Sequence, residues 1–288
     1  MTIDDHFVSL LCKLYHFCTT EGIIGKMSYE TKVESELGEN QPAWSERDLS
    51  QNPHTASDKA QRVEAMFQSI SGRYDLNNRI HSFWLDQLWR KKAVLAANLT
   101  NEDHVVDVAC GTGDLSIAFS KANAKSIIGI DFTQGMIDIA IQKAKREQLS
   151  IDFRWGDAMA LELPDESADV ISIAFGIRNV QDPAIAISEF YRVLKPKGRL
   201  VILEFSAPKQ PVIRLMNNLY TKHIMPRTAS FIAGDSSGAY HYLPKSVDTF
   251  LEVKALGRLT QEAGFLNVTQ TPLTFGVCTI TVGHKVIQ

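Results

Sequence analysis

Three features are scarce in this 288-residue sequence: paired cysteines, a long apolar run and an excess of charge of one sign. No two of its four cysteines have the spacing of metal ligands, which argues against a disulfide framework and a zinc site. No apolar run approaches the roughly 18–20 residues of a membrane-spanning helix. The net charge of −3 lacks the basic excess of nucleic-acid-binding proteins. We therefore expect no metal centre and no nucleic-acid partner.

Targeting features are also missing near the N-terminus. Asp4 and Asp5 precede the first short apolar run, whereas a signal peptide begins with positive charge. Residues 1–50 hold nine acidic side chains against four Lys or Arg, which is unlike a basic transit peptide. We expect a cytoplasmic protein of a bacterium. Residues 1–55 show weak periodicity, and we predict that they form a mostly disordered tail.

From about residue 56 the pattern becomes regular. Apolar segments typical of buried strands alternate with segments of helical period, and two further strand patterns follow at the C-terminal end. This alternation predicts an α/β domain over residues 56–288, with a mainly parallel sheet and helices on both faces. Residues 209–245 are apolar and aromatic with few strand signals. We predict that they form a helical lid over the substrate, with ordinary core packing as the alternative.

The stretch DVACGTGDLSIAF, residues 107–119, places two glycines between a predicted strand and a predicted helix. Gly111 and Gly113 would let a ligand touch backbone amides directly. The stretch has no lysine for a P-loop, and Ser116 stands where a dinucleotide fingerprint has its third glycine. Asp107 would repel a pyrophosphate. A cofactor with a cationic end and no phosphate fits better, and S-adenosylmethionine is such a cofactor.

Two further acids support an adenosyl cofactor. Asp131 ends the strand after the glycine turn, where a carboxylate can accept hydrogen bonds from both ribose hydroxyls. Asp157 follows the next strand, within reach of an adenine amino group. Alone, the glycine pair could be an ordinary tight turn and Asp131 a helix N-cap. Together the three features follow strand ends, where doubly wound sheets bind ligands.

Four longer segments resemble the ubiquinone and menaquinone C-methyltransferase family (UbiE/MenG). They are SGRYDLNNRIHSFWLDQLWRKKA (71–93), FGIRNVQDPAIAISEFYRVLKPKGRLVILEFSAP (175–208), HIMPRTASFIAGDSSGAYHYLPKSVDTF (223–250) and LTFGVCTITVGHK (273–285). The resemblance covers about residues 57–287. It implies a class I methyltransferase fold, which is a Rossmann-like seven-stranded sheet with an antiparallel last strand. It also implies methyl transfer from S-adenosylmethionine to a ring carbon of a prenylated quinol.

The resemblance also implies site residues. It assigns cofactor contacts to Thr112 in the glycine turn, to Asp131, and to Asp157 with Ala158. It assigns catalysis to Arg178, Asn179 and Tyr74: the arginine would stabilise a phenolate, and the other two would orient the ring oxygens. One departure is Ala174, where the family often has serine.

Structural interpretations of these residues stay open. Tyr74 could be a core aromatic residue, and Arg178 could pair with Asp182. His223 and His241 are candidate bases that are more often structural.

The acceptor is not fixed by the residues alone. Demethylmenaquinol is the leading acceptor, and a methoxy-benzoquinol of ubiquinone synthesis, or both, comes second. A different small-molecule acceptor, a non-catalytic cofactor-binding scaffold and an NAD-dependent oxidoreductase are further hypotheses. A transient membrane contact through the basic residues 90–92 and a homodimer also stay open.

Overall fold

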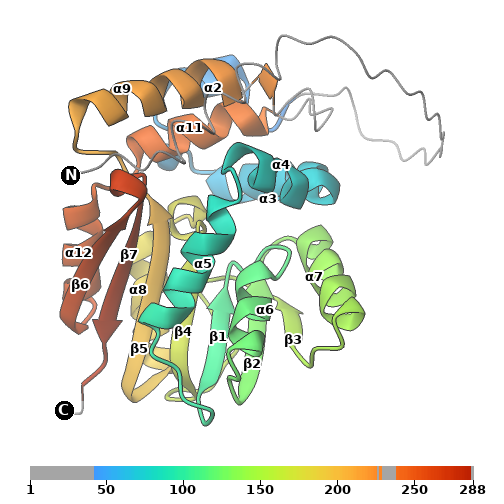
Figure 1. The fold of residues 1–288 in the computed structure, drawn as a ribbon, viewed down its shortest axis with the longest axis vertical. Coiled ribbons are helices and arrows are strands. Elements are labelled where there is room, and N and C mark those ends of the chain that lie inside the picture. The colour runs from blue at the N-terminus through green and yellow to red at the C-terminus, as the bar shows by residue number, and fades with distance from the viewer. Residues whose placement is uncertain (1–41, 226, 229–237, 287–288) are drawn as a thin grey trace. The chain divides into compact units, whose positions relative to one another are not determined.

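Seven strands form one sheet in the order β3-β2-β1-β4-β5-β7-β6. The computed structural model describes residues 42–225, 227–228 and 238–286 (Figure 1). The strands are β1 (His104–Val108), β2 (Ser126–Asp131), β3 (Asp152–Trp155), β4 (Ala168–Ala174), β5 (Leu194–Phe205), β6 (Leu266–Leu273) and β7 (Cys278–His284). Each strand overlaps a segment whose pattern is typical of a strand, although β5 begins earlier than its pattern predicts, at Leu194, within a segment of helical period.

The first five strands run parallel, and β7 runs antiparallel to both of its neighbours. β7 therefore lies between β5 and β6. This arrangement confirms the predicted sheet with its antiparallel last strand. The carboxyl ends of the parallel strands meet at one edge, which is where such sheets bind ligands.

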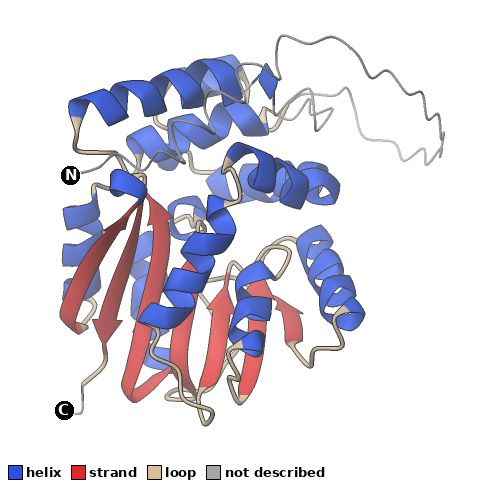
Figure 2. Cartoon of the chain, in the orientation of Figure 1, coloured by secondary structure: helices blue, strands red, loops and turns tan. Residues whose placement is uncertain are grey.

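Helices cover both faces of the sheet (Figures 1 and 2). One face packs against α5 (Leu85–Ala96) and α6 (Asp114–Lys121), with α7 (Gln134–Arg146) beside β2 and β3. The other face packs against α8 (Pro183–Val193) and α12 (Val253–Glu262). Neighbouring residues of a strand point to opposite faces, so Val105 lies in the first core and Val106 in the second.

Further helices lie beyond the carboxyl edge of the sheet (Figure 1). They are α2 (Glu46–Ser50), α3 (Lys59–Ile70), α4 (Tyr74–His81), α9 (Pro211–Leu219) and α11 (Ala239–Thr249). A third hydrophobic core joins α3 to α11. The described part of the predicted 209–245 insertion is thus helical. Residues 226 and 229–237 lie outside the described residues.

The boundary predicted for the N-terminal tail is wrong for residues 42–55. Trp44 is only 2% exposed and stacks on Tyr242 of α11 at 4.7 Å between ring centroids. Ser45 caps α2 in a capping box with Asp48. These residues belong to the domain because a buried tryptophan and a capped helix fix them. The rest of the predicted tail, residues 1–41, lies outside the described residues.

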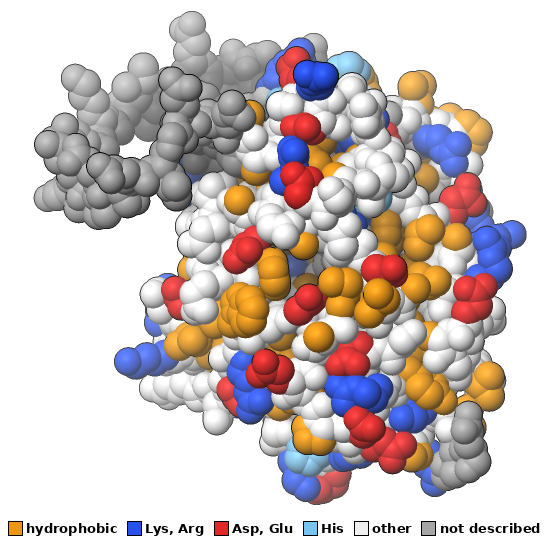
Figure 3. Space-filling model, turned by 180° about the vertical axis from the view of Figure 1, so that it is seen from behind, with side chains coloured by type: hydrophobic (Ala, Val, Ile, Leu, Met, Phe, Trp, Pro, Cys, Tyr) orange, Lys and Arg blue, Asp and Glu red, His pale blue; other side chains and the backbone are white. Residues whose placement is uncertain are grey.

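The described residues contain no helix that is both long and apolar enough to cross a bilayer, and no cluster of side chains arranged to hold a metal ion. On the face seen in Figure 3, their Lys and Arg side chains are interspersed with Asp and Glu.

We expect Trp44→Ala to lower the free energy of unfolding by about 3–5 kcal/mol, because it empties a buried aromatic site. Trp155→Ala is the matched control, since Trp155 is 55% exposed, and should cost less than about 1 kcal/mol. Urea denaturation measures both. Equal losses for the two variants would contradict the packed position of residues 42–55.

Candidate active site

Two adjoining pockets lie at the carboxyl edge of the sheet. The first, which we call the cofactor pocket, is lined by loops that follow β1, β2, β3 and β4, including Gly111, Asp131, Asp157 and Ala158. The second, the acceptor pocket, is lined mainly by the helices beyond the edge and includes Arg178. Phe67, Tyr74 and Phe175 line both pockets and form the boundary between them.

The glycine turn needs both of its glycines. Gly111 and Gly113 have φ values of +55° and +83°, in the left-handed region that favours glycine. A Cβ on Gly113 would lie 2.8 Å from Cζ of Phe153. The ring of Tyr74 lies directly over Gly111, 4.0 Å from the position of a Cβ there. The turn is therefore tightly packed at Gly113, whereas at Gly111 the positive φ is what favours glycine; α4 contributes the residue above the turn.

Asp131 is held in place by backbone amides. Its carboxylate accepts hydrogen bonds from the N–H of Gly111 at 2.7 Å and of Thr133 at 2.9 Å. Burial raises its pKa, although both amides favour the charged form. Thr133, not Asp131, is the N-cap of α7, so the N-cap interpretation is wrong. A positioned carboxylate that lines this pocket fits a ribose with two hydroxyls.

Asp157 and Ala158 lie farther along the same pocket. One carboxylate oxygen of Asp157 accepts a hydrogen bond from the N–H of Met159 at 2.9 Å. Ala158 is nearly buried and joins the core beneath the pocket. An anchored carboxylate next to apolar side chains suits a flat base that donates an amino group.

Asp107, Thr112 and Gly113 do not line the cofactor pocket. The Asp107 side chain lies on the α6 side of the sheet and accepts hydrogen bonds from Ser116 and Ser172 at 2.6 and 2.8 Å. Burial raises its pKa to about 6. The Thr112 hydroxyl donates to Asp75 at 2.5 Å. These groups support the turn from behind, and their contact with a cofactor stays a prediction.

The pocket floor is strained where two strand ends meet. Ala109 and Phe175, just after β1 and β4, have φ values of 50° and 58°. A Cβ on Gly176 would lie 2.5 Å from the Cβ of Ala109. Non-glycine residues with positive φ cost energy and persist only when their surroundings fix them. Here they bring the loop after β4 against the glycine turn.

Arg178 belongs to a buried ion pair, although not to the predicted one. Its Nη1 donates to Glu204 at 2.6 Å and to the carbonyl of Phe175 at 2.8 Å. Arg178 and Glu204 are each 3% exposed, and the guanidinium also lies over the ring of Phe205. Asp182 instead caps α8 by accepting from the amide of Ala184. The predicted partner is therefore wrong, whereas a position beside a pocket agrees with the proposed role.

Asn179 faces the cofactor pocket rather than the acceptor pocket. Its Oδ1 accepts a hydrogen bond from the Tyr242 hydroxyl at 3.0 Å, and its Nδ2 lies 3.4 Å from the carbonyl of Phe175. These contacts tie α11 to the wall between the two pockets. The predicted contact of Asn179 with ring oxygens stays a prediction.

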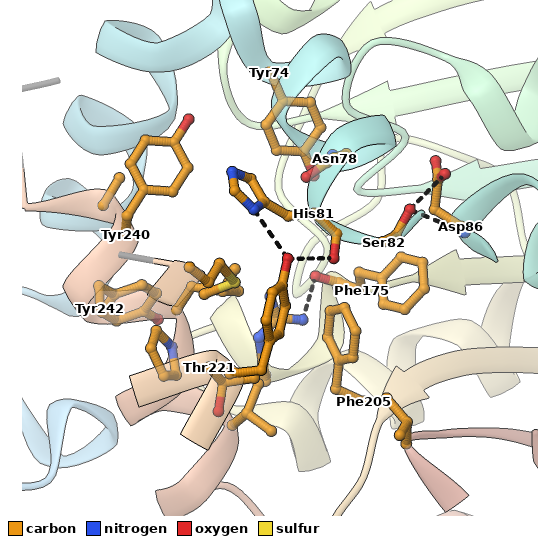
Figure 4. A pocket seen from close by; sticks show the side chains of 18 of the residues that line it. Tyr74, Asn78, His81, Ser82, Asp86, Phe175, Phe205, Thr221, Tyr240 and Tyr242 are labelled. Atoms are coloured by element: carbon orange, nitrogen blue, oxygen red, sulfur yellow. Dashed lines mark hydrogen bonds between the residues drawn. The ribbon is translucent and has the colours of Figure 1, made fainter. Parts of the chain in front are cut away.

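The acceptor pocket is rich in phenol hydroxyls (Figure 4). Tyr74, Tyr220, Tyr240 and Tyr242 all line it. Burial raises the pKa of Tyr74, and it raises the pKa of Tyr242 to about 12. At Tyr74 the charges of Arg90 and Arg178 oppose this rise, and at Tyr242 the charge of Arg178 opposes it. A phenol in this pocket therefore stays protonated unless a cation stabilises its anion.

His81 lines the acceptor pocket but is absent from the predicted site residues. Its Nδ1 lies 3.1 Å from the Tyr220 hydroxyl, and its buried Nε2 has no hydrogen-bond partner among the described residues. Figure 4 shows the ring between Tyr74 and Tyr240. Burial lowers the pKa of His81 below the ordinary 6.5, which favours the neutral ring. His81 lies in helix α4, which the sequence pattern does not predict, so no local feature of the sequence pointed to this residue.

Two other predicted candidates lie elsewhere: His223 and His241 do not line either pocket. Arg90, predicted as part of a surface basic patch, is instead 7% exposed, lines the acceptor pocket and lies 3.5 Å from Asp86. Only Lys91 and Lys92 of that triplet are exposed, so the predicted patch loses a charge.

Comparison with known proteins agrees with this geometry. The model of the ubiE/COQ5 methyltransferase family matches residues 55–285. The chain is 43% identical over 229 residues to a demethylmenaquinone methyltransferase of Deinococcus radiodurans, covering 79% of this chain and 94% of the relative. It is 42% identical over 221 residues to the protein of the same name from Thermus thermophilus, covering 76% of this chain and 100% of the relative.

Solved structures agree on the fold. A SAM-dependent methyltransferase from Thermotoga maritima superposes with a TM-score of 0.55 at 21% identity, over 77% of this chain and 99% of that chain. One from Aquifex aeolicus gives 0.53 at 19% identity, over 75% and 98%. At such identities the likeness supports the fold alone.

We expect Asp131→Asn to weaken S-adenosylmethionine binding roughly 10- to 100-fold, because hydrogen bonds to a charged group are worth about 1.5–3 kcal/mol. An amide also presents a donor toward the N–H of Gly111. Isothermal titration calorimetry measures the affinity. Asp138→Asn, an exposed change on α7 nearby, should leave it unaltered. Unchanged binding by Asp131→Asn would remove this carboxylate from the cofactor site.

Proposed function

The chain belongs to the ubiE/COQ5 methyltransferase family, and from this premise we propose that it methylates a ring carbon of reduced demethylmenaquinone, with S-adenosylmethionine as the methyl donor. The names of the relatives support this acceptor, since both matched proteins are demethylmenaquinone methyltransferases. A cytoplasmic location, a transient membrane contact and a homodimer stay predictions within this proposal.

The cofactor pocket supplies groups suited to an adenosyl cofactor. Asp131 would accept hydrogen bonds from the ribose, and Asp157 would accept one from the adenine amino group. The glycine turn would let the amino-acid end approach the backbone closely, because Gly111 lines the pocket without a side chain. When bound, S-adenosylmethionine supplies a methyl group on a positively charged sulfur. Tyr74 and Phe175 then define where the two pockets meet, and a ring between them would lie next to the cofactor.

The observation that carries the proposal is the buried guanidinium of Arg178, which lines the acceptor pocket. Burial raises the pKa of the Tyr74 and Tyr242 phenols; the charge of Arg178 opposes this rise at both, and at Tyr74 the charge of Arg90 opposes it as well. A quinol is also a phenol, and its ring carbon becomes nucleophilic as its hydroxyl loses a proton. Arg178 would stabilise that anion, while Glu204 and Phe205 keep the guanidinium in place. An arginine is a poor base because it stays protonated.

His81 is the residue we propose as the proton acceptor. Its neutral ring has an unpartnered Nε2 in the acceptor pocket, and its Nδ1 is fixed by the Tyr220 hydroxyl. The proton of the ring hydroxyl would move to Nε2 as the ring carbon bonds to the methyl group and the bond from methyl to sulfur breaks. Loss of the hydrogen on that ring carbon to solvent, and return of the proton from Nε2 to the ring oxygen, would then restore the aromatic quinol. General-base catalysis of this kind contributes about 10²–10⁴-fold to a rate.

We expect the pure protein, given S-adenosylmethionine, to methylate reduced demethylmenaquinone in preference to the methoxy-benzoquinol precursor of ubiquinone. Mass spectrometry of a competition between the two acceptors measures the products. A methylated benzoquinol alone would change the acceptor. Bound cofactor with neither product would favour a non-catalytic scaffold.

We expect Arg178→Lys to lower kcat roughly 100-fold, because lysine lacks the planar fork that contacts both Glu204 and Phe175. Lysine keeps a positive charge, whereas alanine would leave Glu204 buried and unpaired at a cost of about 3–5 kcal/mol. Arg258→Lys, an exposed change on α12, is the matched control. Thermal unfolding and cofactor affinity are measured beside kcat. A wild-type kcat in Arg178→Lys would exclude the proposed role.

We expect the wild-type rate to fall as pH drops through the lowered pKa of His81, on an acid limb below pH 6.5, because protonation removes the acceptor. His81→Gln should lower kcat about 100-fold and abolish this limb, since glutamine can accept a hydrogen bond but not a proton. Steady-state rates across pH test both effects. A rate that keeps the same acid limb in His81→Gln would assign the proton to another group.

A further inference from the structure

Helix α9 turns its apolar side outward. Val212, Leu215, Met216 and Leu219 recur at the spacing of one helical face and are 70, 70, 48 and 57% exposed. The helix buries none of its residues. A surface helix of a globular protein normally points its apolar side at the core. Ordinary core packing therefore does not account for this face.

The other side of the same segment faces the acceptor pocket. Asn217, Tyr220 and Thr221 line that pocket, and Tyr220 is hydrogen-bonded to His81. Polar groups thus point inward and leucines point outward. A continuous exposed apolar face on a helix marks a contact with a partner or a lipid surface.

The charged residues near α9 indicate which kind of surface binds its exposed apolar face. Residues 206–234 contain Lys209, Arg214, Lys222 and Arg227 but no Asp or Glu, although the whole chain has a net charge of −3. Of these basic residues, Lys209, Arg214 and Arg227 are exposed in the structure. An apolar helix face within a purely basic segment is the combination that binds an anionic membrane surface.

We propose that the outward face of α9 docks on the surface of a lipid bilayer that contains anionic lipids. The inference deepens the proposed function and rests on it in one respect: a prenylated acceptor resides in the bilayer. Docking through α9 places lipid on the outer side of a segment whose inner side, through Asn217, Tyr220 and Thr221, lines the acceptor pocket. The acceptor ring can then enter the pocket while its prenyl tail stays in contact with lipid.

Vesicle flotation of the full-length protein tests the proposal. The probes are vesicles of phosphatidylcholine with phosphatidylglycerol and vesicles of phosphatidylcholine alone. We expect the double variant Leu215→Gln/Leu219→Gln to bind the anionic vesicles roughly 10- to 100-fold more weakly than the wild type, since glutamine removes apolar surface that the leucines would bury against lipid. Leu95→Gln is the matched control, because Leu95 is 77% exposed at the far end of α5.

Three results would overturn the proposal. They are equal flotation of the double variant and the wild type, no flotation of the wild type, and a wild-type dimer that the double variant converts to a monomer in sedimentation. The last would assign the face to a second copy of the chain. Wild-type binding to anionic vesicles should also weaken at high salt and be lower on phosphatidylcholine alone.

The test is independent of methyl transfer. Flotation needs no cofactor and no acceptor, so docking can be established even if the proposed reaction fails. Conversely, the double variant should methylate a short-chain, water-soluble quinol as fast as the wild type, because neither leucine lines the acceptor pocket. If the double variant loses both flotation and this activity, it has misfolded. Thermal unfolding detects such misfolding, and a milder Leu215→Ala/Leu219→Ala variant then tests docking in a folded protein.

Discussion

The buried ion pair between Arg178 and Glu204 is the interaction on which the two-pocket arrangement depends. It joins the loop after β4 to the end of β5, and the same guanidinium closes the loop onto the carbonyl of Phe175. Phe175 in turn forms part of the boundary between the pockets. Burying two charges is costly, and a hydrophobic pair of similar volume would often be as stable. The pair therefore makes better sense as a means of holding a cation beside the acceptor than as a source of stability.

A second polar network connects helices α4 and α7 to the glycine turn. Lys143 of α7 donates to Asp75 and Asp114 at 2.7 and 2.5 Å, and Arg79 of α4 also binds Asp114. Asp75 accepts from Thr112, and its neighbour Tyr74 lies over Gly111. Thus the residue above the cofactor turn is positioned by contacts to the turn itself. The cofactor side and the acceptor side are therefore built from shared residues.

Sequence patterns predicted what local periodicity and topology determine. The buried strands β1, β2 and β4 followed from their apolar runs, and Asp131 could be placed because parallel strands end at one edge. Helix α4 escaped prediction because its residues include few apolar side chains and it is held by ion pairs to distant segments. The partner of Arg178 could not be read locally, since Glu204 comes from a neighbouring strand and Asp182 has a capping role nearer in sequence. The unpartnered nitrogen of His81 likewise depends on which helices meet in space.

Burial shifts the pKa values of the acids and of the base in the acceptor pocket in opposite directions. Burial raises the pKa of the Tyr74 and Tyr242 phenols, yet it lowers the pKa of His81, because in each case it disfavours the charged form. A neutral imidazole suits the base of the proposed mechanism, whereas the phenolate of that mechanism is penalised by the same environment. Two cations among the described residues line the pocket: Arg90, whose partner Asp86 also lines it, and Arg178, whose partner Glu204 does not. In the proposed mechanism the charge of Arg178 therefore offsets the penalty on the phenolate, and a base and a cation from different elements act together.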